Sequence, residues 1–203
     1  MVLRTVVACL GDSITAGSPL WDPDPVLRAR LGDAADPHSQ WEHWAGLTTP
    51  RLRFRNHGVY GERTDEIAAR LGVAVLGADV LVVQGGINDV VQRRPVEEAA
   101  RNLAGMVEDG LQRGLAVALA DVLPWNNGDA RGAADIAGLN ALIHALAADF
   151  GVPLLPFHDT LVDPERPERM RDGLSDDGDH PSVEGHRLLG ERSAPILQAA
   201  PSA

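Results

Sequence analysis

A serine near the start of the chain and an aspartate–histidine pair near its end have the side chains that nucleophilic catalysis requires. Ser13 follows Gly11 and Asp12, and Asp177 precedes His180 by three residues. A serine hydroxyl becomes a good nucleophile when a base accepts its proton, and histidine is the usual base near neutral pH. A carboxylate on the second ring nitrogen fixes the tautomer and orientation of the histidine. Because a three-residue turn can return the Asp177 carboxylate to the imidazole, we expect Ser13, His180 and Asp177 to act together.

Amide groups in the neighbouring loops could stabilise the negative charge that develops on a carbonyl oxygen during such an attack. Donors for this charge must be fixed in advance. Ser13, at a strand-to-helix turn, offers its own backbone N–H. Gly61 offers a second N–H, since glycine lets the backbone approach a ligand closely, and the Asn88 side-chain amide offers a third. Gly58 lies in the same loop as Gly61 and is the alternative donor, ranked lower.

The candidate residues follow short apolar segments that are rich in β-branched side chains. Continuous apolar runs of this length are typical of strands in a parallel sheet that is covered on both faces. The sequence therefore predicts strands at 2–10, 52–57, 80–84, 116–121 and 153–156. In open α/β sheets, sites lie at the carboxyl ends of the strands. The loops that carry the nucleophile, the amides and the Asp/His pair should then share one rim.

Stretches with helical spacing separate these strands, and they predict helices at 64–76, 96–112, 134–150 and 183–197. Thr64 is the expected cap of the first of these helices. Strands that alternate with helices indicate an α/β sandwich with right-handed crossovers. No repeat, linker or low-complexity tract divides the 203 residues, so we predict a single domain over 1–203 with a sizeable core.

Four sequence blocks, in this order, resemble those of the SGNH hydrolases, also called the GDSL esterase/lipase family. They are Gly-Asp-Ser-Ile-Thr at 11–15, residues 56–61 followed by Thr64, Gly-Ile-Asn-Asp at 86–89, and Asp-Gly-Asp-His-Pro at 177–181. Each block alone is a weak signal, but all four in order, each after a predicted strand, are a strong one. Ile14 stands where the name motif of the family has leucine. With the strand and helix pattern, the resemblance covers nearly the whole chain.

The resemblance implies a three-layer α/β/α sandwich of the flavodoxin-like type, with a five-stranded parallel sheet in the order 2-1-3-4-5. It implies a carboxylic ester hydrolase that forms an acyl-enzyme on Ser13. Ser13, Gly61, Asn88 and His180 take the four named roles of the family, and Asp177 completes the triad. The family is not known for needing a metal, and we expect no cofactor.

Tryptophans and other isolated residues near the motifs support weaker expectations. Three of the four tryptophans lie in the insertion at 18–49. Aromatic side chains at the rim could form an acyl pocket or a platform for a sugar ring, and we expect Trp21 or Trp125 to line the pocket. Trp41 and Trp44, at helical spacing, could equally anchor a helix to the core.

Four further residues have expected structural roles. Asp12 and Asp89 should hold their loops through backbone amides. His186 should have a surface or capping role, and Cys9 should be a small buried residue of the first strand.

Composition limits the possible partners. The formal net charge is −11, from 18 basic and 29 acidic residues. Such a surface repels nucleic acid and anionic membranes, and it argues mildly against a strongly anionic substrate, although the site itself could be neutral. With one cysteine, no internal disulfide can form. No apolar run approaches the length of a membrane span, and we expect a cytoplasmic protein that acts on a small soluble ester without stable membrane association.

Three questions stay open at the level of sequence. The motifs do not separate O-acetyl esters, simple carboxylic esters, thioesters and lysophospholipids, and they say nothing of the oligomeric state. A metal-dependent hydrolase is the first alternative, with ligands from the acidic loop: Asp176, Asp177, Asp179, His180 and Glu184. A non-catalytic binding module on the same fold is the second alternative, disfavoured because no member of the triad is missing.

Overall fold

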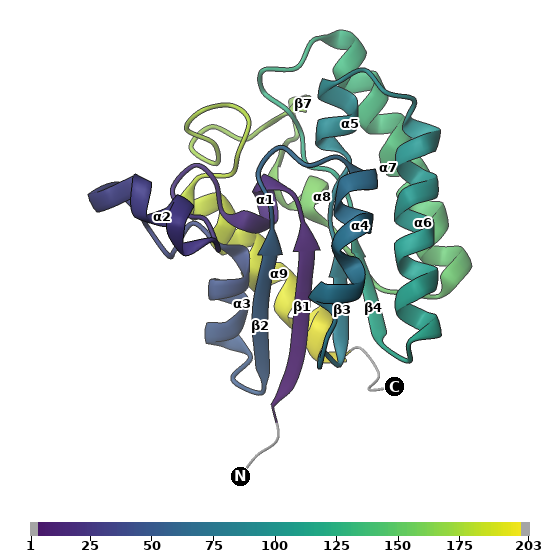
Figure 1. Ribbon diagram of the computed structural model, residues 1–203. Helices are drawn as coiled ribbons and strands as arrows, with labels where there is room; N and C mark the ends of the chain where they lie inside the picture. Colours follow the sequence, from purple (N-terminus) through teal and green to yellow (C-terminus); the bar gives the residue numbers. More distant parts are fainter. Residues whose placement is uncertain (1–3, 200–203) are drawn as a thin grey trace.

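A five-stranded parallel sheet forms the centre of the computed structural model, which describes residues 4–199 (Figure 1). Its strands are β1 (Thr5–Gly11), β2 (Leu52–Gly58), β3 (Val80–Val83), β4 (Ala116–Ala120) and β5 (Leu154–Leu155). Their order is β2-β1-β3-β4-β5, and every neighbouring pair is parallel. The expected fold class and strand order are confirmed. All carboxyl ends of the strands therefore lie at one edge of the sheet.

Helices cover both faces of the sheet, because successive side chains of each buried strand point to opposite sides. In β3, Leu81 and Val83 belong to one hydrophobic cluster, and Val80 and Val82 belong to the other. The first cluster is closed by α4 (Thr64–Ala74), α5 (Ile87–Val91), α6 (Val96–Gln112) and α7 (Ala130–Phe150). The second is closed by α3 (Trp41–Thr48), α8 (Phe157–Leu161) and α9 (Val183–Ala199). Figure 1 shows α4 in front of the sheet and α9 behind it.

Several element ends differ from those predicted, for local reasons. The helix expected at 64–76 is α4, and Thr64 is its first residue and not its cap. The preceding residue, Arg63, is the N-cap, and its backbone N–H donates to the Glu66 carboxylate at 3.0 Å. The helix expected at 134–150 begins earlier, at Ala130, because the Asp129 carboxylate accepts the Gly132 N–H at 2.8 Å. Residues 2 and 3 of the first predicted strand lie outside the described residues.

Short elements that the sequence analysis did not predict surround the carboxyl edge. They are α1 (Ser13–Ala16), α2 (Pro25–Leu31), a 3-10 turn (Gly32–Ala34), α5, α8 and the antiparallel pair β6 (Val162–Asp163) and β7 (Arg166–Met170). The start of α2 has a clear local cause, because the Asp24 carboxylate accepts the Val26 N–H at 2.7 Å and Pro25 occupies the first helical position.

By length and composition alone, α7 could cross a membrane, with a mean hydropathy of 1.2 over 18 residues. Its side chains Ile136, Leu139 and Ile143 are buried in the cluster that this helix forms with the sheet. One face of α7 therefore packs against the core of the sheet.

Candidate active site

Ser13 lies at the turn between β1 and α1, at the carboxyl edge of the sheet. The Asp12 side chain caps this turn by accepting the Ile14 N–H at 2.9 Å, so the expectation that Asp12 holds its loop is confirmed. Burial raises the pKa of Asp12 to about 6, while the hydrogen bond from Ile14 acts in the opposite direction. Ser13 is the first residue of α1, where a backbone N–H has no acceptor within the helix. Both the hydroxyl and the N–H of Ser13 are thus available at the edge of the sheet.

A chain of hydrogen bonds joins Ser13 to the loop before α9. His180 Nε2 lies 3.1 Å from Ser13 Oγ, and His180 Nδ1 lies 2.7 Å from Asp177 Oδ2. The three residues that the sequence analysis singled out are therefore brought together, although 167 positions separate Ser13 from His180. An ionised carboxylate only accepts hydrogen bonds, so Nδ1 is the nitrogen that carries the proton when the ring is neutral. Nε2 is then left as an acceptor facing the serine hydroxyl.

The Asp177 carboxylate is fixed by its own turn. Its Oδ1 accepts the backbone N–H groups of Asp179 at 2.9 Å and of His180 at 2.8 Å. Burial acts to raise the pKa of Asp177, but the hydrogen bonds from the His180 ring and from these two amides hold the pKa below its usual value. The carboxylate is therefore ionised throughout the neutral range, in the form that orients an imidazole.

Contacts from a distant loop hold this turn in place. Gly178 has a φ of +83°, and a Cβ at this position would lie 2.6 Å from Asn127 Oδ1. Asn127 Nδ2 in turn donates to the Asp177 carbonyl at 2.8 Å. The loop after β4 thus packs directly on the turn that carries the Asp/His pair, and only glycine fits at their closest approach.

The expected charge-stabilising amides also lie at this edge. Asn88, in α5, donates one hydrogen of its side-chain amide to the Glu62 carbonyl at 2.9 Å. A side-chain amide has two hydrogens, so this bond fixes the group and leaves the other hydrogen for a ligand. The backbone N–H of Gly61, where φ is +78°, has no hydrogen-bond partner within residues 4–199. Ser13, Gly61 and Asn88 all line one pocket.

Gly58, the alternative donor, is placed differently. Its N–H donates to Asn56 Oδ1 at 2.9 Å, and a Cβ at Gly58 would overlap the backbone of Ala16. Gly58 lines a separate hollow with Arg70 and not the pocket of Ser13. The geometry therefore favours Gly61 over Gly58 as the donor next to Ser13.

Arg70 braces the loops that carry these donors, a role that the sequence analysis missed. From α4, its guanidinium donates to the carbonyls of Gly11 at 3.1 Å and His57 at 2.9 Å, and to the Glu62 carboxylate at 2.8 Å. Asp89, in α5, accepts the backbone N–H of Thr64 at 2.9 Å and so connects α5 to the start of α4. These contacts join the loops after β1, β2 and β3 into one unit.

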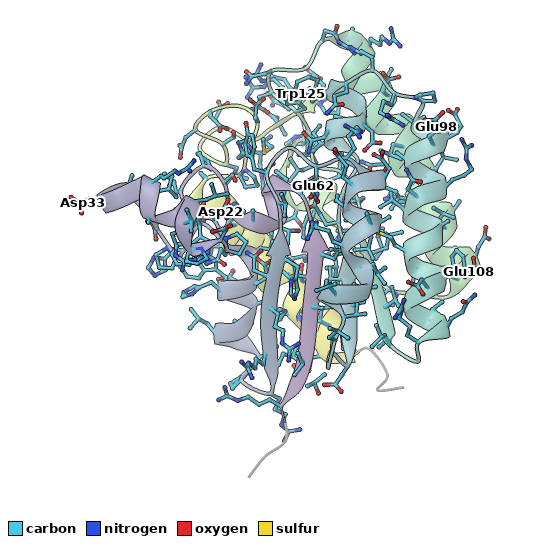
Figure 2. All side chains as sticks on the ribbon, viewed as in Figure 1. Asp22, Asp33, Glu62, Glu98, Glu108 and Trp125 are labelled. Atoms are coloured by element: carbon cyan, nitrogen blue, oxygen red, sulfur yellow. The ribbon has the colours of Figure 1, made fainter. Side chains whose placement is uncertain are left out.

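The pocket around Ser13 has a volume of about 160 Å³. Its lining consists of Ser13, Ile14, Tyr60, Gly61, Ile87, Asn88, Val91, Trp125, Asp179 and His180. Trp125 and Glu62 are labelled in Figure 2, beyond the carboxyl ends of the strands. Tyr60, which was not predicted from the sequence, is 65% exposed, and its ring centre lies 6.0 Å from that of His180. Its position directly before Gly61 was the available signal.

The tryptophans of the insertion lie elsewhere. Trp21 is not among the described residues that line the Ser13 pocket, and the Arg28 guanidinium lies 4.6 Å from the centre of its ring. Trp41 is fully buried, 5.6 Å from the ring of Phe157 and 6.0 Å from the ring of Phe54. Trp41 therefore anchors α3 to the core, and of the tryptophans weighed for the pocket, Trp125 is the one that lines it.

Cys9 and His186 are both fully buried. Cys9 is fully buried in β1, as expected. The expected surface or capping role of His186 is wrong, because this residue is fully buried in α9 and both of its ring nitrogens lack a hydrogen-bond partner within residues 4–199. Burial, together with the nearby His180, lowers the pKa of His186 to about 3, so the ring is neutral.

The acidic residues of the alternative metal site have other partners. Asp177 binds His180, Asp179 accepts the Trp125 indole N–H at 2.6 Å, and Glu184 pairs with Arg187. Within the part of the chain that the structure describes, no group of three or more His, Cys, Asp or Glu side chains is placed to hold a metal ion.

Solved structures with the same fold come from several bacteria. A protein assigned to the G-D-S-L lipolytic family from Desulfitobacterium hafniense DCB-2 has a TM-score of 0.78 at 22% identity, over 96% of this chain and 100% of that one. A GDSL-like lipase from Bacteroides thetaiotaomicron VPI-5482 has a TM-score of 0.73 at 22% identity, over 97% and 89%. A carbohydrate acetylesterase from Sinorhizobium meliloti has a TM-score of 0.75 at 20% identity, over 97% and 99%. At these identities the likeness shows the fold.

Sequence comparison identifies the family. No curated protein sequence matches the chain significantly. The model of one protein family, in contrast, matches residues 9–188, which span every loop of the site from the end of β1 to the first turns of α9. The chain therefore belongs to the GDSL-like lipase/acylhydrolase family and is a carboxylic ester hydrolase.

Proposed function

We propose that this hydrolase cleaves its ester through an acyl-enzyme on Ser13, with His180 as general base and Asp177 as the group that orients the histidine. One observation carries the proposal: Ser13 Oγ, the His180 ring and the Asp177 carboxylate form a continuous chain with contacts of 3.1 and 2.7 Å. Each member contacts the group on which it has to act. Ser13 and His180 both line the pocket, which supports the binding of a small ester next to this chain.

The reaction follows from the positions of these atoms. Ser13 Oγ attacks the ester carbonyl carbon while its proton moves to His180 Nε2. The carbonyl oxygen becomes an oxyanion, which the N–H groups of Ser13 and Gly61 and the side-chain amide of Asn88 stabilise. The imidazolium then gives its proton to the departing alcohol as the carbon–oxygen bond breaks. A water molecule, deprotonated by His180, hydrolyses the acyl group from Ser13 and restores the free site.

The small pocket supports a small or medium acyl group. Its volume of about 160 Å³ suits an O-acetyl or short-chain carboxylic ester better than the long chain of a lysophospholipid. Tyr60 and Trp125 add two aromatic side chains to the lining, and such rings can stack on a sugar. The neighbour from Sinorhizobium meliloti, a carbohydrate acetylesterase, makes sugar acetates a natural class to test alongside thioesters.

A series of p-nitrophenyl esters with acyl chains of increasing length tests the proposal, together with acetylated sugars. We expect turnover of the shortest esters and its loss in Ser13→Ala, with the fold intact. A fluorophosphonate should label the wild type once, at Ser13. Ser193→Ala is the matched control, since Ser193 is fully buried in α9 and does not line the pocket. Full activity in Ser13→Ala would contradict the proposal.

Chelation separates the serine mechanism from a metal-dependent one. A Ser-His-Asp site needs no cation, so activity should survive prolonged dialysis against a chelator. Loss of activity under these conditions, with recovery on adding a divalent metal, would instead support the alternative that uses the acidic loop.

A further inference from the structure

The Ser13 pocket contains a carboxylate for which the mechanism has no use. Asp179 lines the pocket together with Ser13 and His180. It lies between the two acid–base residues in sequence, but Asp177 is the aspartate that binds the His180 ring. A charged side chain in the pocket, outside the proton-transfer chain, is placed to act on the substrate.

The Asp179 carboxylate is held by two neutral donors. Its Oδ1 accepts the Trp125 indole N–H at 2.6 Å and the Asn127 side-chain amide at 2.9 Å. Within residues 4–199, no hydrogen bond reaches Oδ2, and no cationic side chain lies within ion-pair distance of Asp179. The orientation of the carboxylate is therefore fixed, while its charge is not balanced by a paired cation.

Among the described residues, no arginine near the rim forms an ion pair with Asp179. Arg63 follows the Gly61 loop and pairs with Asp65 at 3.0 Å, and Arg93 follows α5 and pairs with Asp129 at 2.8 Å. Arg169 reaches the loop after β4, where it donates to the Asn126 carbonyl at 3.5 Å. Apart from His180, none of the residues that line the pocket is basic. Asp179 is therefore the one acidic residue of the pocket lining that the structure describes, and no arginine or lysine accompanies it there.

We propose that Asp179 sets the charge selectivity of this esterase: esters that are uncharged or cationic close to the ester bond are accepted, and anionic ones are rejected. Oδ2 can accept a hydrogen from a hydroxyl or ammonium group of the substrate, whereas a substrate carboxylate or phosphate would meet a like charge. This inference rests on the proposed function, because it assumes that the ester binds at Ser13. A like charge about 6 Å away, at an effective dielectric constant of about 40, corresponds to roughly tenfold in kcat/KM.

Three p-nitrophenyl esters of equal acyl length test the proposal: the neutral butanoate, the anionic 4-sulfobutanoate and the cationic 4-(trimethylammonio)butanoate. The quantity measured is kcat/KM of each charged ester relative to the neutral one. We expect the wild type to disfavour the anionic ester. Asp179→Asn should raise the anionic-to-neutral ratio by about tenfold and lower the cationic-to-neutral ratio.

Asp176→Asn is the matched control. It makes the same change of charge on the same loop, but Asp176 is exposed and does not line the pocket. Solvent screens such a site, so both ratios should change less than about twofold. A tenfold effect in Asp176→Asn as well would show that net charge, and not Asp179, sets the selectivity, and would overturn the proposal.

Salt dependence gives a readout that does not depend on how Asp179→Asn folds. Raising the ionic strength from about 0.02 to about 0.5 M should raise the anionic-to-neutral ratio of the wild type. Salt screens the repulsion between Asp179 and the anionic ester. If the neutral ester is turned over but the anionic-to-neutral ratio responds neither to salt nor to Asp179→Asn, the selectivity proposal fails while the proposed function stands. If the wild type hydrolyses none of the three esters and the fluorophosphonate leaves Ser13 unlabelled, both proposals fail.

Discussion

Of the aspartate–histidine pairs near the carboxyl edge of this sheet, two have similar short distances and opposite burial. In the Asp177–His180 pair, 2.7 Å apart, the aspartate side chain is 36% exposed and the histidine 11%. In the Asp121–His144 pair, 2.9 Å apart, the aspartate is 1% exposed and the histidine 49%. The first pair lies on the loop before α9, and the second joins the end of β4 to α7.

The second nitrogen of each histidine shows what separates a base from a structural contact. His180 binds Asp177 through Nδ1, and its Nε2 faces Ser13 in a pocket. His144 binds Asp121 through Nε2, and its Nδ1 contacts no nucleophile among the described residues. An Asp–His distance alone therefore does not indicate catalysis.

The pKa values of the two carboxylates shift in opposite directions. Burial raises the pKa of Asp121, although the His158 N–H and the His144 ring act against this. The net pKa shift of Asp177 is downward, because its own turn supplies three hydrogen bonds. Asp121 also accepts the His158 N–H at 2.8 Å, which ties the start of α8 to the end of β4. Asp121 thus joins two elements of the fold, whereas Asp177 belongs to the proposed triad.

Asp→Asn substitutions in the two pairs should give the largest difference in kcat. Asp177→Asn keeps the shape of the turn but favours the wrong tautomer of His180, so we expect kcat to fall by up to about 10⁴-fold. Asp121→Asn makes the same chemical change at the other pair, and kcat should stay within about threefold. Steady-state kinetics on a short p-nitrophenyl ester compares the two variants. Equal losses in both would remove the distinction that we draw between the pairs.

Asn88→Ala should have the next largest effect, because it leaves the Asp177–His180 pair intact and removes one of the proposed donors to the oxyanion. Such a donor stabilises the transition state by about 3 kcal/mol, so kcat should fall about a hundredfold or more while KM changes little. Asn140 offers a control of the same residue type, since it is buried and bonds the backbone of Val122 outside the pocket. An unchanged kcat in Asn88→Ala would show that Asn88 has only a structural role in the turn.

The pH profile of kcat/KM should rise between about pH 5.5 and 8, because His180 has to be neutral to accept the Ser13 proton. Asp177, with its lowered pKa, stays ionised over this range. Asp12, with a pKa of about 6, titrates within it and lies close enough to interact with His180. Asp12→Asn should keep the rising limb but move its midpoint to lower pH, because the variant removes a negative charge that favours the imidazolium.

Stability gives an independent check on Asp12. Its pKa is about 6 in the fold and 3.8 in the unfolded reference, so the folded state binds the proton more tightly. The stability that protonated Asp12 contributes is present below about pH 4 and is lost as the pH rises through about 6. The Tm of Asp12→Asn relative to the wild type should therefore increase from pH 4 to pH 7.

A flat activity profile from pH 5 to 8, with His180→Ala still active, would show that this histidine is not the base.

The parts of the molecule that could be predicted are those with a local signal. The apolar runs of β1 to β4 and the helical stripe of α6 follow from the periodicity of the sequence, and the motifs mark Ser13 and His180. Asn127 could not be found in this way, because its contact with the Asp177 carbonyl joins residues 50 positions apart. Arg70 likewise acts on the carbonyl of Gly11, 59 positions away. Such contacts depend on how the loops meet after folding.

His186 and Tyr60 are two residues whose positions could not be predicted from the sequence. A polar residue six positions beyond His180 was expected at the surface, but the stripe of α9 that faces the sheet includes His186. Tyr60 carried no motif of its own, and its place beside His180 follows from the turn before Gly61. Residue type predicts chemistry better than it predicts which side of an element meets the core.

His144→Ala should have the smallest effect, and it tests the comparison from the side of the structural pair. His144 is half exposed, and its ring makes one hydrogen bond, to Asp121. Loss of this bond should lower the free energy of unfolding by about 1 kcal/mol, which is about 2–4 °C in Tm for a chain of this size. Activity should stay within about twofold, because the His180 ring and the Ser13 pocket do not involve His144. Thermal unfolding and ester hydrolysis, measured on the same preparation, give both readouts. A tenfold loss of kcat at an unchanged Tm would mean that the Asp121–His144 pair takes part in the reaction, and that burial does not separate the two pairs as we infer.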